Sequence, residues 1–462
     1  MNMEQKVIIV LVAVIAVVAV AGAAVFLMGG NNDSGEKYSI NGALNVYGNA
    51  DGDYKIDQKD LDIINDIING KKDAKDYKFA DADQKNGVTQ DDAELVKKII
   101  NKEPCTVYIV NQKKTAGEYT SSVKWPIKSA IATASSNNLL LFELSGLTDQ
   151  IKGITFTSSS DPAIEKTLFA YYADRDKVAK LGTSSTAIDI DAAMDTIKSK
   201  NVTAVITDYT DSTLSNEAQF NANGIDVIRI SSAVTDPDRY SSQLLMMAFL
   251  FDTNNEKIYE FAEYNTKILN EIKEKLKSVD SKRKVITCNG AGSVDKATGI
   301  PRMWVSAGSS DYRDVVEAAG GVYGIDEDLL GRISTYTSGA YFNEGDTWVY
   351  EINPSAIISI RAGGWYEGSV DTVKMFEESL SIFNKTGAWE NGGVAVIAGD
   401  APITVRIAYA ACMLYPEIFD LDWANEINQN IMDKFYPEKL NLEGKPFCIT
   451  KEVYEAAKKA AA

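Results

Sequence analysis

The fold is determined by residues 236–279, which read DPDRYSSQLLMMAFLFDTNNEKIYEFAEYNTKILNEIKEKLKSV. Asp236 followed by Pro237 is a typical helix start, with a carboxylate at the N-cap and proline at the first helical position. From residue 256 onward, apolar residues recur at helical spacing for about six turns. They are Ile258, Phe261, Ala262, Ile268, Leu269, Ile272, Leu276 and Val279. A helix over 256–279 would be roughly 36 Å long. We therefore predict a rigid helix between two lobes; the alternative is an ordinary core helix.

Strand and helix patterns alternate on both sides of this stretch. The expected strands are 129–134, 151–156, 204–207 and 225–230 before it, and 285–288, 303–306, 356–360 and 394–398 after it. Such alternation indicates parallel sheets, and ligands bind outside the carboxyl ends of their strands. Residues 200–207 and 352–359 look like equivalent helix-to-strand joints in the two halves. The predicted fold class is therefore α/β, with two Rossmann-like lobes joined by a long rigid helix.

The N-terminus carries an apolar run of 22 residues, 7–28, which is long enough to cross a bilayer. We expect a single-pass protein of the cell membrane with an extracytoplasmic body; a cleaved signal peptide is the alternative. The predicted domains are 1–28 (transmembrane anchor or signal), 29–43 (linker), 44–103 (a small all-α repeat), 104–235 (N-terminal lobe), 236–280 (interlobe helix) and 281–462 (C-terminal lobe).

Composition excludes several function classes. The formal net charge is −18 and no basic cluster occurs, which argues against a nucleic-acid partner. The chain contains no histidine, which excludes Ser-His-Asp and Cys-His catalysis and imidazole metal sites. The cysteines form no CxxC motif and are either thiols or disulfides: Cys105, Cys288, Cys412 and Cys448. Because no catalytic constellation emerges, we predict that the protein is not an enzyme.

An internal repeat with an offset of 32 residues precedes the lobes. Residues 49–60, NADGDYKIDQKD, align with residues 81–92, DADQKNGVTQDD, and each segment leads into an amphipathic helical pattern. Both segments keep oxygen-bearing side chains at positions 1, 3, 9 and 12. Calcium ions need six to eight oxygen ligands from a tight loop of this kind. The repeat therefore predicts calcium binding.

These residues resemble the dockerin type I module over about residues 44–102. The resemblance implies Ca²⁺ as cofactor and a cohesin-like protein as a partner. The implied ligands are Asn49, Asp51, Asp53, the Lys55 carbonyl, Asp57 and Asp60 in the first loop, and Asp81, Asp83, Gly87, Thr89 and Asp92 in the second. Tyr54 stands where the family has glycine, and Lys85 replaces an oxygen ligand. We expect the first loop to bind more tightly.

The body, about residues 106–440, resembles the helix-hinged class of ABC-importer substrate-binding proteins. The likeness is carried by the order of five phrases: 123–126, 129–147, 317–321, 351–358 and 414–419. It implies a metal-chelate ligand (iron-siderophore, haem or corrinoid) and an ABC permease and ATPase as partners. It also implies one surface acid per lobe for permease arginines, here Asp195 and Glu317. The alternative function is a cell-surface interaction protein that docks to a cohesin through the repeat.

Candidate ligand-binding residues fall at or beside the predicted strand ends: Ser135, Asn137, Tyr209, Trp304, Arg361 and Trp365. Aromatic rings can stack on a flat chelate, and a guanidinium can pair with its anionic oxygens. For each residue taken alone, packing within a lobe is the alternative. A preassembled chelate is favoured over a bare ion, because a bare transition-metal site would normally use imidazoles.

Overall fold

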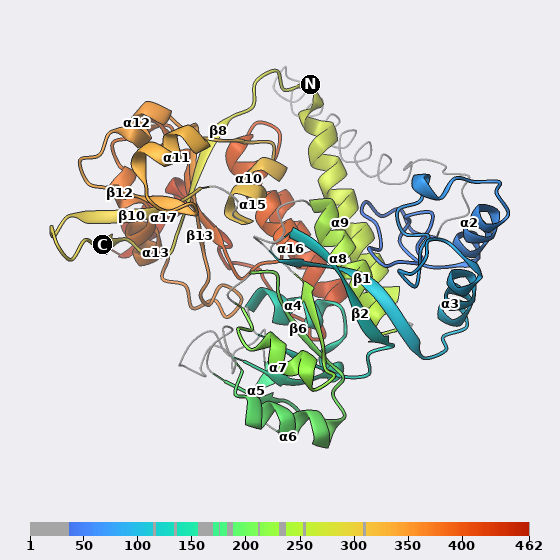
Figure 1. The fold of residues 1–462 in the computed structure, drawn as a ribbon. Helices are drawn as coiled ribbons and strands as arrows, with labels where there is room; N and C mark the ends of the chain where they lie inside the picture. The colour runs from blue at the N-terminus through green and yellow to red at the C-terminus, as the bar shows by residue number, and fades with distance from the viewer. Residues whose placement is uncertain are drawn as a thin grey trace, which may run out of the picture. The chain divides into compact units, whose positions relative to one another are not determined.

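The computed structural model shown in Figure 1 describes residues 37–113, 117–133, 136–155, 170–174, 176–182, 188–210, 213–230, 237–252, 256–307 and 311–461. The chain divides into two compact units, Met1–Ser39 and Ile40–Ala462, and the helices and strands described all belong to the second. The predicted membrane segment 7–28 lies outside the described residues. Within them, no helix combines the length and apolar character needed to cross a membrane.

The sequence repeat is also a structural repeat. Helix α2 (Gln58–Ile68) and helix α3 (Gln90–Ile100) have the same length and begin 32 residues apart (90 − 58), with the short helix η1 (Ala74–Asp76) between them. Each begins with a capping box, Asp57 with Asp60 and Thr89 with Asp92. Matched positions fill the shared core: Ala50 and Ala82, Leu61 and Ala93, Ile64 and Val96.

A β-hairpin that the sequence analysis did not predict follows the repeat. Strands β1 (Cys105–Lys113) and β2 (Gly117–Trp125) pair antiparallel along their whole length. Most of β2 alternates between exposed and half-buried residues, so it lacks the continuous apolar run that marks a buried strand. Trp125 attaches the hairpin to helix α8 (Pro237–Leu250), because its indole N–H donates to the Phe249 carbonyl at 2.7 Å.

The N-terminal lobe is built on a five-stranded parallel sheet in the order β5-β4-β3-β6-β7. Its strands are β3 (Ala130–Ala132), β4 (Ile151–Ile154), β5 (Ala179–Lys180), β6 (Ala204–Asp208) and β7 (Asp226–Ile230). Its helices are α4 (Ser136–Leu144), η2 (Thr148–Gln150), α5 (Ala170–Ala173), α6 (Ile190–Lys200) and α7 (Glu217–Ala222). The parallel sheet predicted for this lobe is confirmed.

Helices α8 (Pro237–Leu250) and α9 (Glu256–Lys275) follow, and α9 ends in the short helix η5 (Leu276–Ser278). The 20 residues of α9, the long yellow-green helix in Figure 1, span roughly 30 Å. Six of the eight predicted apolar residues are buried in α9, including Ile258, Phe261 and Leu269, whereas Leu276 and Val279 lie beyond α9 and are half-buried. Helix α9 packs on α8 and contacts two helices of the following lobe, α15 and α16. The helix predicted between two lobes is therefore present.

The C-terminal lobe has a mixed sheet, with a path in the order β12-β10-β8-β13-β14-β15. Its strands are β8 (Lys284–Asn289), β9 (Ser293–Val294), β10 (Pro301–Ser306), β11 (Val322–Tyr323), β12 (Gly339–Asn343), β13 (Ala356–Arg361), β14 (Val394–Ala398) and β15 (Cys448–Thr450). Strands β8, β13 and β14 run parallel, as predicted, and the short strand β11, which was not predicted, pairs parallel with β8. Strands β10, β12 and β15 run antiparallel to their neighbours, so the expectation of a wholly parallel sheet is wrong here.

The direction of β10 has a local cause. The chain returns from β8 to β10 through residues 290–300 without a helix, whereas a parallel neighbour would need a longer crossover connection. Helices flank this sheet: α10 (Asp311–Ala318), α11 (Glu327–Ile333), α12 (Trp348–Ile352), α13 (Thr372–Leu380), η6 (Ser381–Phe383), α14 (Gly387–Glu390), α15 (Ile403–Leu414), α16 (Leu421–Phe435) and α17 (Lys451–Ala461).

Candidate functional site

Each lobe presents loops at the carboxyl ends of its parallel strands, the edge at which open α/β sheets bind ligands. We call these two edges the mouth. The loops after β8, β13 and β14 are described, whereas those after β3, β4, β5, β6 and β7 lie partly or wholly outside the described residues. Ser135 is among the undescribed residues. Asn137 lies in α4, but its side chain is not described.

Tyr209 follows β6 at the mouth and is half-buried. Its segment is held by Arg229 of β7, whose side chain is 1% exposed. The Arg229 Nη1 donates to the carbonyl oxygens of Asp208 (2.9 Å) and Thr210 (3.2 Å), and Nη2 donates to Glu217 Oε2 at 2.6 Å. Burial opposes ionisation of Glu217, but side-chain hydrogen bonds, first that from Arg229, lower its pKa. Arg229, which sequence reasoning missed, therefore fixes the backbone on both sides of Tyr209.

Arg361 is the last residue of β13, and its guanidinium is directed toward α13. Its Nη1 donates to Glu378 Oε2 and to Ser379 Oγ, both at 3.2 Å. Trp365 is 1% exposed and donates its indole N–H to the Arg361 carbonyl at 2.6 Å. A Cβ at Gly399 would lie 2.7 Å from the Arg361 carbonyl carbon, so glycine is needed where the loop after β14 passes. Arg361 and Trp365 are thus brought together, through contacts within their own lobe.

Trp304 lies in a different setting from the one predicted. Because β10 runs antiparallel to β8, Trp304 stands on a face of the sheet and not at the carboxyl end of a parallel strand. Its ring meets those of Tyr341 (4.9 Å between centroids) and Tyr336 (5.6 Å) edge-on. The Arg302 guanidinium lies 3.9 Å from the centroid of the Tyr341 ring. Strand β8 separates this aromatic group from β13 and the Arg361 loop.

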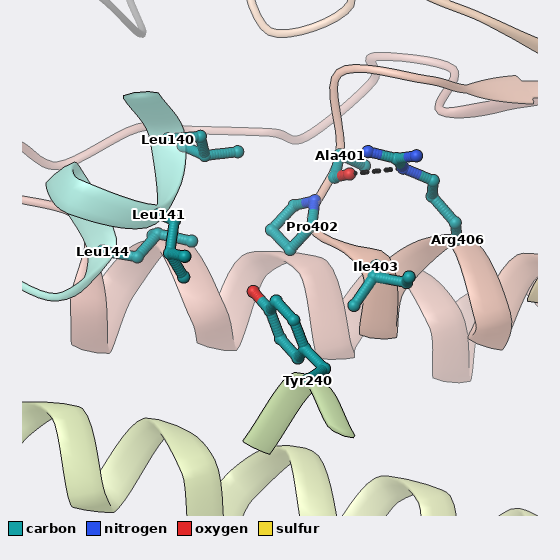
Figure 2. A pocket seen from close by; sticks show the side chains of 8 residues that line it. All are labelled: Leu140, Leu141, Leu144, Tyr240, Ala401, Pro402, Ile403 and Arg406. Carbon is teal, nitrogen blue, oxygen red and sulfur yellow. Dashed lines mark hydrogen bonds between the residues drawn. The ribbon is translucent and has the colours of Figure 1, made fainter. Parts of the chain in front are cut away.

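The two lobes meet at a small cavity, which Figure 2 shows from close by. It is lined by Leu140, Leu141 and Leu144 from α4, Tyr240 from α8, and Ala401, Pro402, Ile403 and Arg406 at the start of α15. Its volume of about 10 Å³ has room for roughly one water molecule. Arg406 is 2% exposed, and its Nε donates to the Ala401 carbonyl at 2.7 Å. The lobes therefore pack closely at this point.

A buried carboxyl group lies on the same helix as the three leucines. Glu143 of α4 is 3% exposed. Burial raises its pKa to about 8, the nearby Glu438 adds to the rise, and Lys257 opposes it. Helix α4 contacts α16 of the C-terminal lobe, so this carboxyl lies where the two lobes meet. Sequence reasoning missed it, because a single glutamate in an apolar helix gives no signal of its partners.

The first loop of the repeat surrounds Asn49, which is fully buried. Its Nδ2 donates to two carbonyl oxygens, of Leu44 (2.7 Å) and of Asp53 (2.9 Å). These two acceptors fix the orientation of the amide, and no donor among the described residues reaches Oδ1. Burial raises the pKa of Asp53 to about 6 and that of Asp60 to about 7, and the charge of Asp51 adds to both shifts. The loop thus holds a buried, unpaired oxygen beside crowded carboxylates.

The second loop gathers its carboxylates more tightly. Oxygens of Asp81, Asp83 and Asp92 all lie within 4.8 Å of one another. As in the first loop, the last aspartate accepts backbone N–H groups, here from Asp83 (2.9 Å) and Thr89 (2.7 Å). The Lys85 ammonium lies 3.6 Å from Asp83 Oδ2 and offsets part of the negative charge. Carboxylate, amide and carbonyl oxygens are the donors that Ca²⁺ prefers, so both loops fit that ion.

The structure also shows where Tyr54 and the two predicted permease contacts, Asp195 and Glu317, lie. Tyr54 does not adopt a positive φ; its ring is 7% exposed and packs edge-on against Tyr259 of α9. Asp195 is exposed on α6 of the N-terminal lobe. Glu317 is half-exposed on α10 of the C-terminal lobe and accepts a hydrogen bond from Arg313 Nε at 2.9 Å. Each lobe therefore carries one of the two predicted surface acids.

No protein-family model matches the chain, and no curated protein matches it. Solved structures do match. The TroA-like periplasmic binding protein FepB from Veillonella parvula aligns with a TM-score of 0.54 and 17% identity, over 72% of this chain and 97% of that one. Weaker matches include CeuE of Helicobacter pylori (TM-score 0.47, 15% identity, 72% and 96% covered) and the periplasmic heme-binding protein HutB of Vibrio cholerae (0.43, 15%, 63% and 100%). The chain therefore has an α/β fold of the periplasmic binding protein type.

Proposed function

We propose that the protein is the extracytoplasmic substrate-binding component of an ABC importer for a metal chelate, an iron-siderophore, haem or a corrinoid. The observation that carries this proposal is the joining of two α/β lobes through the helices α8 and α9. Open α/β sheets of this kind bind ligands at the loops that follow the carboxyl ends of their strands. An ABC permease and ATPase would be its partners, with Asp195 and Glu317 as contacts to the permease.

The ligand chemistry follows from the side chains present. The whole chain lacks histidine, so a bare transition-metal ion would miss its commonest protein ligand. Tyr209 is the best supported of the predicted ligand contacts, because Arg229 holds its backbone at the mouth. Arg361 and Trp365 would first have to leave their contacts within the lobe. The roles of Ser135, Asn137 and Trp304 remain predictions.

A ligand panel tests this function. The full chain in detergent would be titrated with ferric siderophores, haem and cobalamin, and with Zn²⁺ and Mn²⁺, by calorimetry and tryptophan quenching. We expect one chelate to bind and Tyr209→Ala to weaken its binding. Tyr350→Ala, an exposed tyrosine on α12, is the matched control. Tight binding of a free divalent ion with no response to any chelate would overturn the proposal.

We also propose that the repeat binds Ca²⁺. The specific observation is Asn49 Oδ1, which is buried without a donor at position 1 of a loop whose other predicted side-chain ligands are all aspartates. Leaving such an oxygen unpaired costs about 1–3 kcal/mol, which a cation would offset. Calorimetry on the full chain should detect Ca²⁺ binding that Asp51→Ala with Asp60→Ala weakens. Asp62→Asn on the exposed face of α2 should bind as the parent does. A cohesin-like partner for the repeat remains a prediction.

A further inference from the structure

Residues 41–49, which we call the strap, connect the first calcium loop to the helices between the lobes. At its start, Asn41 donates its backbone N–H to Thr266 Oγ1 (3.0 Å) and its side-chain Nδ2 to Asn270 Oδ1 (3.1 Å), both on α9. The next bond goes to α8, where the Ala43 N–H donates to Ser242 Oγ at 3.1 Å. The strap is therefore fastened to both helices.

The strap is also hydrogen-bonded to the first calcium loop. The Leu44 N–H donates to the Asp53 carbonyl at 2.9 Å, and the Leu44 carbonyl accepts from Asn49 Nδ2 at 2.7 Å. Asn49 and Asp53 are two of the predicted calcium ligands. Both backbone groups of Leu44, which is 1% exposed, are thus bonded to residues that a cation would hold.

Two further contacts limit how the strap can move. It pairs with strand β1 through Tyr47 N–H to the Tyr108 carbonyl (2.9 Å) and Val110 N–H to the Asn45 carbonyl (3.0 Å). The loop itself touches α9, because the Tyr54 ring packs against that of Tyr259 with centroids 5.7 Å apart. A conformational change in the loop can therefore affect α9 both through the hydrogen bonds of the strap and through the ring contact of Tyr54.

We propose that Ca²⁺ in the first loop acts as a brace for the interlobe helices, so that α8 and α9 open less often when the ion is bound. The carboxylates of Asp51, Asp53 and Asp60 are held in one loop, because Asp60 accepts from the Asp51 N–H at 3.1 Å and Asp51 accepts from the Asp53 N–H at 3.0 Å. Without the ion their negative charges repel one another, which favours loosening of the loop and release of Leu44. With the ion, Asn49 and Asp53 become fixed. Since folded-state ligands stabilise every element that unfolds with their site, the protection extends to α8 and α9. This inference rests on the proposed calcium binding.

Hydrogen exchange of the full chain in detergent, with Ca²⁺ or with a chelator, tests the brace. Calcium should slow exchange about tenfold or more in residues 49–60 and also in α8 and α9. The variant Tyr54→Ala with Thr266→Val and Asn270→Ala, which removes the described contacts of Tyr54 and of Asn41 to α9, should still bind Ca²⁺ and protect residues 49–60, but should lose the protection of α9. Thr298→Val, on an exposed turn of the C-terminal lobe, should behave as the parent does.

The comparison of the parent chain with and without Ca²⁺ does not depend on whether any variant folds. Calcium binding with protection of residues 49–60 and unchanged exchange in α8 and α9 would overturn the brace and leave the calcium site standing. Absence of calcium binding in calorimetry would overturn both proposals together.

Discussion

Asn201 and Asn353 end helices α6 and α12 in the same left-handed conformation, with φ/ψ of 52°/46° and 47°/62°. Each donates its N–H to the carbonyl four residues earlier, of Ile197 and Val349 respectively. A strand begins three residues later in both cases, β6 in the N-terminal lobe and β13 in the C-terminal lobe. The equivalence of these joints, predicted from two short phrases, is confirmed at the level of the backbone.

Substitutions at Asn201 should therefore show whether its left-handed backbone conformation, and not the size of its side chain, determines stability. Alanine in the left-handed region costs about 1–2 kcal/mol, whereas glycine reaches it freely. We expect Asn201→Ala to lower the free energy of unfolding by about 1 kcal/mol and Asn201→Gly to change it much less. Urea denaturation measures both, and the same pair at Asn353 is the matched comparison. Equal unfolding free energies for the alanine and glycine variants would contradict this interpretation.

Calcium binding should depend on pH. Without the ion, the pKa values of Asp53 and Asp60 are raised from 3.8 to about 6 and about 7, so these carboxyls destabilise the fold increasingly as pH rises from about 4 through 7. Calcium binds the ionised groups. We expect its affinity to rise between pH 5 and pH 7.5, about tenfold or more, with release of protons.

Calorimetry at pH 6 in two buffers with different ionisation enthalpies measures that proton release. Asp60→Asn should reduce it, while Asp62→Asn should leave it unchanged. Binding with identical heats in the two buffers would show that these carboxyls are already ionised in the absence of the ion.

Glu143→Gln should stabilise the protein at high pH. The folded-state pKa of Glu143 is raised from 4.5 to about 8, so the native state loses stability as pH rises above about 4.5, and the loss is complete above about 8. Glutamine removes that cost. We expect the melting temperature to rise by about 3 °C or more at pH 9 and to stay unchanged at pH 4. Glu260→Gln on the exposed face of α9 is the control, and an equal shift at both pH values would argue against a buried carboxyl.

Arg229→Met should loosen the segment that carries Tyr209. The change removes the Arg229 hydrogen bonds to the carbonyls of Asp208 and Thr210, which then keep only Thr213 as a donor, and it removes one partner of Glu217. We expect a loss of about 2 kcal/mol in unfolding free energy and faster hydrogen exchange in residues 208–217. Adding Glu217→Gln should recover part of the stability. A change below about 0.5 kcal/mol would show that water replaces the guanidinium.

Parallel strands buried on both faces were predictable, because they are apolar runs that end in small polar residues. The clearest case is β14 (Val394–Ala398), which has the predicted bounds. Strands β1 and β2 escaped prediction because one face of β2 is exposed and one face of β1 is only half-buried. The direction of β10 depends on a connection that the sequence does not reveal. The site was less predictable than the fold. Arg229 and Glu143 matter through partners on other elements of the fold, whereas the predicted ligands in each loop of the repeat lie within one contiguous segment.

The strap also bears on the order in which the protein can fold. Asn41 and its partner Thr266 are 225 residues apart along the chain. At about 5–20 residues per second, the ribosome makes Thr266 roughly 10–45 s after Asn41. The two loops of the repeat, complete by residue 92, therefore exist as nascent chain well before the helix to which the strap is hydrogen-bonded. The part of this body that is synthesised first is among the last to reach its docked position.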